Sequence, residues 1–189
     1  MNEIEENKVF IGVNWGAIER RNILGKKIVP VDLDVCCVVK NTSDKITKLV
    51  YYATKSAFND AISHSGDDFQ GDRFGDDGLD NEIISVELDR LPEDIKSLTF
   101  ILNSYSNHEF SKIPFTSIRL YTGNSNDPTI TYRKFDISEN GEFADCVSMI
   151  LGSVYKSDTG WSFALDGTAT DDQTLEEIIH RLKSESGDV

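Results

Sequence analysis

The sequence predicts a mainly β protein: a two-sheet β-sandwich with acidic, cation-binding loops at one end and a C-terminal α-helix. Three observations carry this prediction. Short segments rich in β-branched and aromatic residues recur between turn signals. Apolar and polar residues alternate along several of them. Helical periodicity is clear only near the C-terminus. A chain of 189 residues is one domain's length, so we expect a single domain over 1–189, strand-rich from 8 to 168.

The predicted strands follow one another along the chain, separated by turn sequences such as RLPED, NSNDP, SENGE and SDTG. In chain order they are VFIGVNW (9–15), VPVDLDVCCVV (29–39), KLVYYA (48–53), EIISVEL (82–88), SLTFILNSY (97–105), TSIRLYTG (116–123), TITYRKFDI (129–137), CVSMILGSVY (146–155) and WSFALDG (161–167).

Strand 29–39 alternates cleanly, which places Leu33, Val35 and Cys37 on one face and Asp34 and Cys36 on the other. The polar segment GAIERRNILGKKIVP (16–30) before it is expected to be a solvated loop. Its four cations leave a second interpretation open, a small basic patch for an anionic partner: Arg20, Arg21, Lys26 and Lys27.

One helix is predicted at about 171–184. Its apolar residues fall at i, i+3, i+4 and i+7, the stripe of an amphipathic helix: Leu175, Ile178, Ile179 and Leu182. Thr170 and Gln173 have the spacing of a capping box, and acidic residues follow near the positive end of the helix. His180 lies beside the stripe and is expected on the surface.

Charge and cysteine content narrow the functional classes. The chain has 33 acidic and 19 basic residues, a net charge of −14, which disfavours binding nucleic acid or an anionic membrane surface without a bridging cation. No basic and apolar leader opens the sequence, and no apolar run approaches the ~20 residues of a membrane span, so we expect a cytoplasmic protein. Three cysteines do not form a disulfide framework. Cys36 and Cys37 are expected to be buried strand residues, with a soft-metal thiol pair as the alternative.

The segment SHSGDDFQGDRFGDDGLDNE (63–82) contains seven carboxylates, one arginine and four glycines. Glycines allow positive φ and let backbone carbonyls turn inward. Carboxylates with inward carbonyls are the oxygen ligands of a hard cation, and calcium takes six to eight of them in irregular geometry. A plain solvated loop is the alternative.

Asp32 and Asp34 lie on one strand face roughly 6.6 Å apart, a separation at which two carboxylates can flank an ion. The alternative is that both lie on the solvent face of an edge strand. The spacing of the acidic residues is not that of an EF-hand.

The order of these segments resembles the TerD family of tellurite-resistance and stress-response proteins. The matching pieces are VDLDVCCVV, HSGDD and DNEIISVEL, followed by LPEDIKSLTFILNSY, IPFTSIRLY, FADCVSMILGSVYK and GWSFALDG. The resemblance runs from about residue 9 to residue 167. Asn14-Trp15-Gly16 departs from the family's usual G-W-D, and Asn81 replaces an aspartate found in many members.

The resemblance implies a calcium-binding, non-catalytic β-sandwich of cytoplasmic type, which holds two calcium ions. Its implied partners are calcium and other stress-response proteins or a membrane-associated complex, without direct nucleic-acid binding. The expected carboxylate ligands are Asp32, Asp34, Asp67, Asp68, Asp72, Asp76, Asp77, Asp80 and Glu82, with backbone carbonyls of Phe69, Gly71 and Leu79.

Two other functions use the same residues. A divalent-metal-dependent hydrolase needs a base near the carboxylates, and His64 is the nearby candidate. A calcium-dependent binding or scaffold module needs exposed contacts beside the ion, and Phe69 and Phe74 are the candidates. Calcium-selective binding without turnover distinguishes the module from the enzyme.

Overall fold

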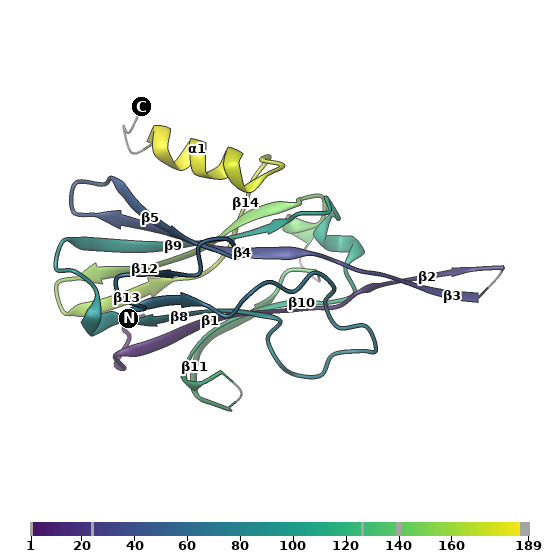
Figure 1. Ribbon diagram of the computed structural model, residues 1–189, viewed down its shortest axis with the longest axis horizontal. Coiled ribbons are helices and arrows are strands. Elements are labelled where there is room, and N and C mark those ends of the chain that lie inside the picture. The colour runs from purple at the N-terminus through teal and green to yellow at the C-terminus, as the bar shows by residue number, and fades with distance from the viewer. Residues whose placement is uncertain (1, 24, 126, 139–140, 186–189) are drawn as a thin grey trace.

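Two antiparallel sheets pack face to face, and one helix covers the outer face of one of them (Figure 1). This arrangement comes from a computed structural model that describes residues 2–23, 25–125, 127–138 and 141–185. The first sheet has the strand order β11–β10–β1–β8–β7–β6. Its strands are β1 (Lys8–Trp15), β6 (Ser56–Ala57), β7 (Ile62–His64), β8 (Glu82–Glu87), β10 (Thr116–Asn124) and β11 (Asp127–Asp136).

The second sheet has the order β13–β12–β9–β4–β5, with β14 added alongside β12. Its strands are β4 (Leu33–Asn41), β5 (Ile46–Val50), β9 (Ile95–Ser104), β12 (Ser148–Ser157), β13 (Gly160–Ala164) and β14 (Thr168–Ala169). Three 3-10 turns complete the connections, at Leu88–Arg90, Phe110–Lys112 and Gly141–Phe143. The predicted mainly β sandwich with a C-terminal helix is confirmed.

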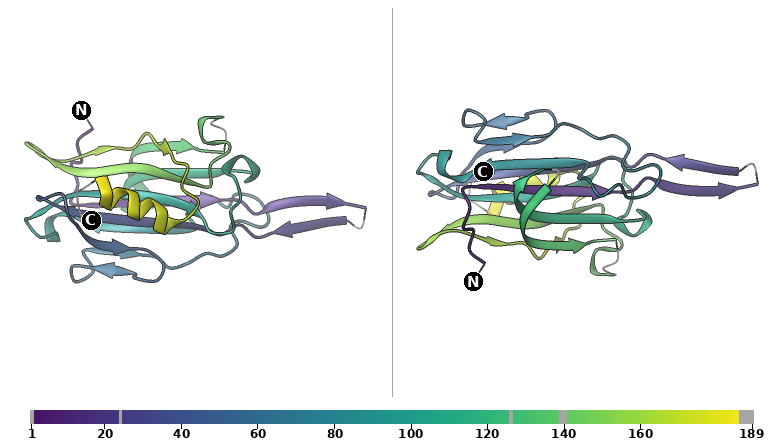
Figure 2. Two further views of the ribbon diagram at one scale, coloured as in Figure 1. Left: turned by 90° about the horizontal axis from the view of Figure 1, so that it is seen from above. Right: turned by 90° about the horizontal axis from the view of Figure 1, so that it is seen from below.

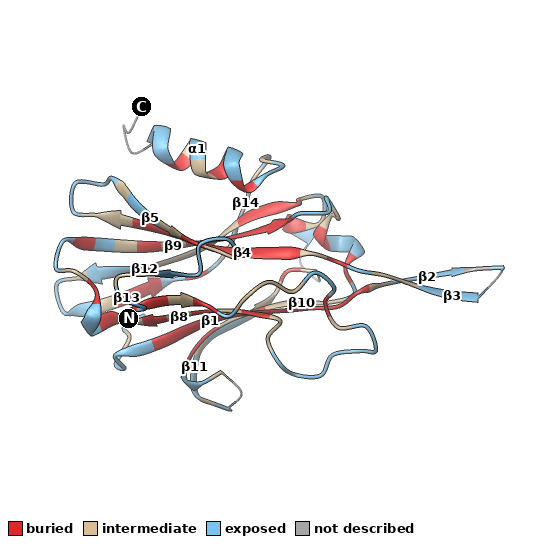
Figure 3. Ribbon diagram, in the orientation of Figure 1, coloured by how far each residue is buried: buried red, intermediate tan, exposed pale blue. Residues whose placement is uncertain are grey.

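The main core lies between the sheets, where the inward faces of β1, β8 and β10 meet those of β4, β9 and β12 (Figure 3). Trp15, Phe100 and Phe110 are among its fully buried side chains. Alternation explains this core, because every second side chain of a strand points to the same face. Leu33, Val35, Cys37 and Val39 all belong to it, as their alternation predicts.

Helix α1 (Leu175–Glu185) forms a second, smaller core on the outer face of β4 and β9. Leu175, Ile178 and Leu182 pack there against Cys36 and Ile101. Cys36 therefore lies under the helix and Cys37 in the sandwich core, and both are fully buried. His180 is exposed, as expected.

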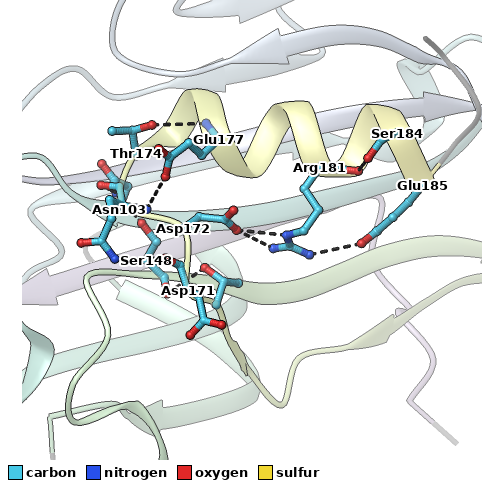
Figure 4. Close-up of polar contacts among 11 residues, drawn as sticks. Asn103, Ser148, Asp171, Asp172, Thr174, Glu177, Arg181, Ser184 and Glu185 are labelled. Atoms are coloured by element: carbon cyan, nitrogen blue, oxygen red, sulfur yellow. Dashed lines mark hydrogen bonds and ion pairs between the residues drawn. The ribbon is translucent and has the colours of Figure 1, made fainter.

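The helix begins four residues later than predicted, and its cap differs. The Oγ1 of Thr174 accepts the N–H of Glu177 at 3.2 Å, and the Glu177 carboxylate accepts the N–H of Gln173 (Figure 4). Thr170 instead donates to the carbonyl of Ser148. The prediction of a Thr170–Gln173 capping box was wrong, because Thr174 and Glu177 satisfy the same spacing one turn later.

The segment predicted as a solvated loop is a two-stranded hairpin, which corrects the expectation for residues 16–30. Strands β2 (Ile18–Asn22) and β3 (Gly25–Val29) pair with each other and with no other strand among the described residues. The hairpin projects well beyond the sandwich in every view (Figure 2). Polar side chains on both of its faces removed the alternation by which a strand is recognised.

Candidate metal centre

Three carboxylates converge where the N-terminal end of β4, in one sheet, meets a loop of the other sheet. Asp32 precedes β4, Asp34 is the second residue of β4, and Asp67 lies in the loop that joins β7 to β8. One oxygen from each lies within 4.8 Å of the others. We call Asp32, Asp34 and Asp67 the inter-sheet trio. The sequence predicted all three as ligands.

The inter-sheet trio combines one buried residue, Asp34, with two half-buried ones, and some of its buried oxygens lack hydrogen bonds. Asp34 is only 4% exposed. The buried Oδ1 atoms of Asp32 and Asp67 have no hydrogen-bond partner among the described residues. A buried polar atom without a partner is costly, and a buried carboxylate more so. Hydrogen bonds within the described residues therefore leave these two oxygens without a partner.

Burial and mutual repulsion oppose ionisation of the trio. Burial, with the nearby Glu82 and Asp32 carboxylates, raises the pKa of Asp34 to about 8. Burial and the Asp67 carboxylate raise the pKa of Asp32 to about 6. The pKa of Asp67 is raised as well, mainly by burial. A divalent cation would remove both causes, because it replaces lost hydration and separates like charges.

Glu82 lies beside the trio, but its carboxylate accepts backbone hydrogen bonds, one of which joins the two sheets. It is the first residue of β8, it is fully buried, and its carboxylate accepts the N–H of Val35 at 3.0 Å and of Asp68 at 3.2 Å. Val35 belongs to β4, so this contact crosses from one sheet to the other. Glu82 therefore helps to hold the two sheets together beside the trio, and its carboxylate contributes to the raised pKa of Asp34.

His64, the candidate base of the hydrolase hypothesis, is buried behind Glu82. Its Nδ1 accepts the N–H of Gly66 at 3.0 Å, and its Nε2 lies 3.3 Å from the Glu82 Oε2, with no hydrogen bond formed there. Its side chain has no exposed surface. His64 therefore supports the loop beside the Glu82 carboxylate, and its Nε2, although it forms no hydrogen bond, is buried out of reach of a substrate.

The acidic loop is ordered largely by its own carboxylates. Asp68 accepts the N–H groups of Gln70 and Gly71, and Asp72 accepts that of Asp77. Backbone bonds join the loop to the end of β1 and the residues after it: the N–H of Asp72 donates to the carbonyl of Trp15, and the N–H of Ala17 donates to the carbonyl of Asp72. The four glycines take positive φ as predicted: Gly66, Gly71, Gly75 and Gly78. At Gly71 a Cβ would lie 2.5 Å from the Trp15 ring, so no larger residue fits.

A second group of carboxylates lies on this loop. One oxygen each of Asp72, Asp76 and Asp77 lies within 4.8 Å of the others, and we call these residues the loop trio. It is more exposed than the inter-sheet trio, and all three carboxylates already accept hydrogen bonds. The N–H of Gly78 and the amide of Asn14 hold the pKa of Asp76 below its usual value. Two groups fit the expectation of two ions, but the loop trio has less need of one.

Asp80 lies apart from both groups. Its carboxylate accepts two hydrogen bonds from the Nε of Arg119, at 2.8 and 3.0 Å, and a third from the Tyr121 hydroxyl at 2.9 Å. It lies over β1 at Gly12, where a Cβ would overlap it. Burial and the Asp80 charge raise the pKa of Tyr121. This carboxylate is already neutralised by an arginine, which makes it a poor cation ligand.

Asn81, next to Asp80, organises the loop instead. Its Oδ1 accepts the N–H of Trp15 at 2.8 Å, and its Nδ2 donates to Asp68 and Asp72 at 3.2 Å each. Sequence reasoning treated this residue only as a lost charge. Its neutral amide links the two loop carboxylates to β1, a role that an aspartate would not fill as a donor.

A cavity of about 200 Å³ opens above the inter-sheet trio. Three aromatic residues line it with the three carboxylates: Tyr52, Phe69 and Tyr105. Sequence reasoning missed Tyr52 and Tyr105, which lie 53 residues apart in the chain and belong to no motif. Phe69 and Phe74 are 62% and 94% exposed, so neither tucks under the loop.

Of the backbone-carbonyl candidates, Phe69 lines the cavity, Gly71 packs on Trp15, and Leu79 is exposed on the loop. The inter-sheet trio thus supplies hard oxygen donors, an opening and two buried oxygens without a hydrogen-bond partner among the described residues. These are the properties of a divalent-cation site with room for further oxygen ligands.

The comparisons with known proteins agree with this architecture. The sequence model of the TerD domain matches residues 2–182. Stress response protein SCP2 of Bacillus subtilis (strain 168) is 27% identical, covering 93% of this chain and 89% of its own length. Tellurium resistance protein TerZ of Serratia marcescens is 23% identical, covering 91% and 85%.

The fold is also seen in a crystal structure of a homologue of telluride resistance protein (TerD) from Streptomyces coelicolor A3(2). That structure superposes with a TM-score of 0.69 at 16% identity, over 90% of this chain and 94% of the other. With the family match spanning nearly the whole sequence, the chain belongs to the TerD domain family.

Proposed function

We propose that this protein is a calcium-binding, non-catalytic module of the TerD stress-response family, which holds one calcium ion at the inter-sheet trio. The observation that carries the proposal is the pair of buried, unpartnered oxygens of Asp32 and Asp67 beside the buried Asp34 carboxylate. A second, weaker ion is proposed at the loop trio.

Calcium is favoured over magnesium by the shape of the site. The trio comes from a strand, the residue before it and a loop, and it supplies only three of the six to eight oxygens that calcium takes. Calcium accepts irregular coordination at ~2.3–2.6 Å, whereas magnesium demands near-octahedral geometry at ~2.0–2.1 Å. The cavity above the trio leaves room for water or a ligand group to complete the larger shell.

The proposed role is that of a calcium-dependent binding or scaffold module in the cytoplasm. The ion would join β4 of one sheet to the β7–β8 loop of the other, beside the Glu82 contact that already crosses between them. Exposed Phe69 and Tyr105 flank the opening and offer apolar contacts for a partner. The hydrolase alternative has no supporting geometry at His64.

Isothermal titration calorimetry with calcium, in a background of about millimolar magnesium, tests the proposal. We expect binding of two ions of unequal affinity, the tighter one lost in Asp34→Asn and the weaker one in Asp76→Asn. Binding should release protons, because the raised pKa of Asp34 keeps it protonated at neutral pH.

The matched control is Asp171→Asn, which removes a carboxylate near the start of the helix, outside both trios. Its calcium heats should equal those of the wild type. Absence of calcium heat in the wild type below millimolar concentration would refute the proposal.

A further inference from the structure

The β2–β3 hairpin concentrates positive charge in a strongly acidic protein. It carries four of the chain's 19 basic residues and only one of its 33 acidic residues, Glu19. The hairpin leaves the sandwich and extends into solvent, and its outer part is exposed (Figures 2 and 3). Neither trio uses it.

The pairing register places like charges opposite each other. Arg20 pairs with Lys27, and Arg21 pairs with Lys26. Like charges directly opposite on neighbouring strands destabilise a hairpin. Glu19 reduces the repulsion within the Arg21–Lys26 pair, because its carboxylate forms ion pairs with both residues.

The Arg20–Lys27 pair has no such carboxylate beside it among the described residues. In the part of the chain that the structure describes, neither Arg20 nor Lys27 forms an ion pair. Their two charges share one face of the hairpin, since directly paired residues point to the same side. An isolated hairpin is itself only marginally stable. An anionic partner bound at this face would offset the repulsion between Arg20 and Lys27.

An apolar residue, Ile23, lies at the tip of the hairpin. Ile23 is fully exposed, the highest value among the large hydrophobic residues of the described chain. It lies two residues beyond Arg21 and three before Lys26. An exposed apolar residue ringed by Lys and Arg is the composition of segments that enter the headgroup region of anionic membranes.

The net charge of −14 means that the body of the protein is repelled by an anionic surface, but the hairpin is long enough to reduce this repulsion at its tip. Five strand residues span about 17 Å at ~3.4 Å per residue. The Debye length is about 8 Å at physiological salt. The tip therefore extends about two screening lengths from the body, so repulsion of the acidic body by an anionic surface is strongly reduced there.

We propose that the β2–β3 hairpin is a membrane-docking element, which places Ile23 among the headgroups of an anionic bilayer and Arg20 and Lys27 against lipid phosphates. An acidic protein surface offers the same charge complementarity, but its charged side chains would not bury the fully exposed Ile23 side chain at the tip. The proposal goes beyond the calcium function and does not depend on a bound cation.

Co-sedimentation with phosphatidylglycerol vesicles and with phosphatidylcholine vesicles, in EDTA, tests the proposal. The wild type should bind the anionic vesicles at least about tenfold more strongly, and the binding should weaken as salt is raised. Arg20→Gln with Lys27→Gln should reduce partitioning about 25-fold, at roughly fivefold for each cation near the surface. Ile23→Ser should also reduce it, because insertion buries apolar surface.

The matched control is Lys48→Gln with Lys183→Gln, which removes the same charge from exposed positions on β5 and α1. Its partitioning should stay within about twofold of the wild type. Melting curves of every variant verify folding, and the hairpin variants should melt with the wild type because they lie outside both cores.

Equal binding of the hairpin variants and the wild type would overturn the proposal, as would failure of the wild type to bind anionic vesicles. Salt-sensitive self-association that the hairpin substitutions abolish, without vesicle binding, would overturn it in favour of an acidic protein partner. Because the vesicles are assayed in EDTA, none of these results depends on whether calcium binds.

Discussion

Among single residues, acidic side chains of this protein occupy three different environments that the amino-acid sequence alone does not distinguish. Asp34 is a buried carboxylate short of partners, Asp68 and Asp77 accept backbone N–H groups of their own loop, and Asp80 is held by an arginine. The environment assigns the role in each case. Two substitutions separate these roles experimentally.

Asp34→Asn should stabilise the metal-free protein and abolish most of the calcium response. At pH 8 the substitution removes a charge whose raised pKa opposes folding, so we expect a gain on the order of a few kcal/mol in EDTA. Denaturant unfolding in EDTA and in calcium measures both effects. A variant that is less stable in EDTA and still stabilised by calcium would contradict the assignment of Asp34.

Arg119→Met should destabilise the protein by about 3–5 kcal/mol, since it leaves the Asp80 carboxylate, 2% exposed, without its cation. The calcium response should be unchanged, because Asp80 lies outside both trios. Asp80→Asn with Arg119→Met should recover part of the loss. Calcium titrations of the same variants provide the check, and a lost calcium response would return Asp80 to the ligand set.

At the scale of elements, the sequence predicted those parts that have a clear period. Strands β1, β8, β9, β10 and β12 appear close to their predicted ranges, because one or both of their faces are apolar. The β2–β3 hairpin has no buried face, so apolar and polar residues do not alternate along it, and the sequence did not indicate that its two strands pair. The helix was found by its stripe, but its start was misplaced because two threonines suited the cap.

The same limit applied to the site. Asp32, Asp34 and Asp67 were predicted from short motifs, and the structure brings them together. Asp80 stays a predicted ligand, but its ion pair with Arg119 on β10, far along the chain, is a contact that no local motif indicates. Tyr52 and Tyr105 meet at the cavity only through the pairing of β4 with β5 and β9, which no local pattern encodes.

Helix α1 should control the reactivity of Cys36 but not of Cys37. Burial raises the pKa of Cys36 to about 12 and that of Cys37 well above its ordinary value, so both thiols should be slow to alkylate in the folded protein. Ile178→Ala removes a fully buried contact of the helix with β4 and should loosen it. Mass spectrometry of alkylated peptides should show faster labelling of Cys36 alone.

Lys183→Ala, on the exposed side of the helix, is the matched control and should leave both rates unchanged. Equal acceleration of both thiols in Ile178→Ala would indicate global unfolding rather than loosening of the helix. Rapid joint labelling in the wild type would revive the soft-metal interpretation of the pair.

At the scale of the whole molecule, the two sheets meet at a point of concentrated negative charge. The inter-sheet trio and Glu82 bring four carboxylates to one end of the sandwich, in a chain with a net charge of −14. Without a cation these charges oppose the packing of the sheets. The stability of the protein should therefore depend on pH and calcium together.

In EDTA, stability should fall as pH rises from about 5 to about 8. The folded pKa values of Asp32 and Asp34 are raised above their unfolded values, so the folded state binds more protons across this window. Ion-paired carboxylates such as Asp44 and Glu87, whose pKa values are lowered, lose their contribution only at more acidic pH. Saturating calcium should flatten the profile, and urea unfolding at each pH measures it.

In Asp34→Asn the slope in EDTA should be reduced, because the group with the larger rise in pKa is gone. Stability that rises between pH 5 and 8 in EDTA would mean that these carboxylates are stabilised in the folded state as anions. That result would remove the electrostatic reason for a cation at this site.

A crystal structure of the protein grown with calcium would show directly whether the inter-sheet trio holds an ion. We expect an ion about 2.3–2.6 Å from carboxylate oxygens of Asp32, Asp34 and Asp67, with water or a backbone carbonyl completing six to eight ligands in the cavity beside Tyr52 and Tyr105. An anomalous signal from calcium identifies the ion. At saturating calcium, an inter-sheet trio without an ion, or ions bound only at the loop trio, would rule out the proposed calcium site.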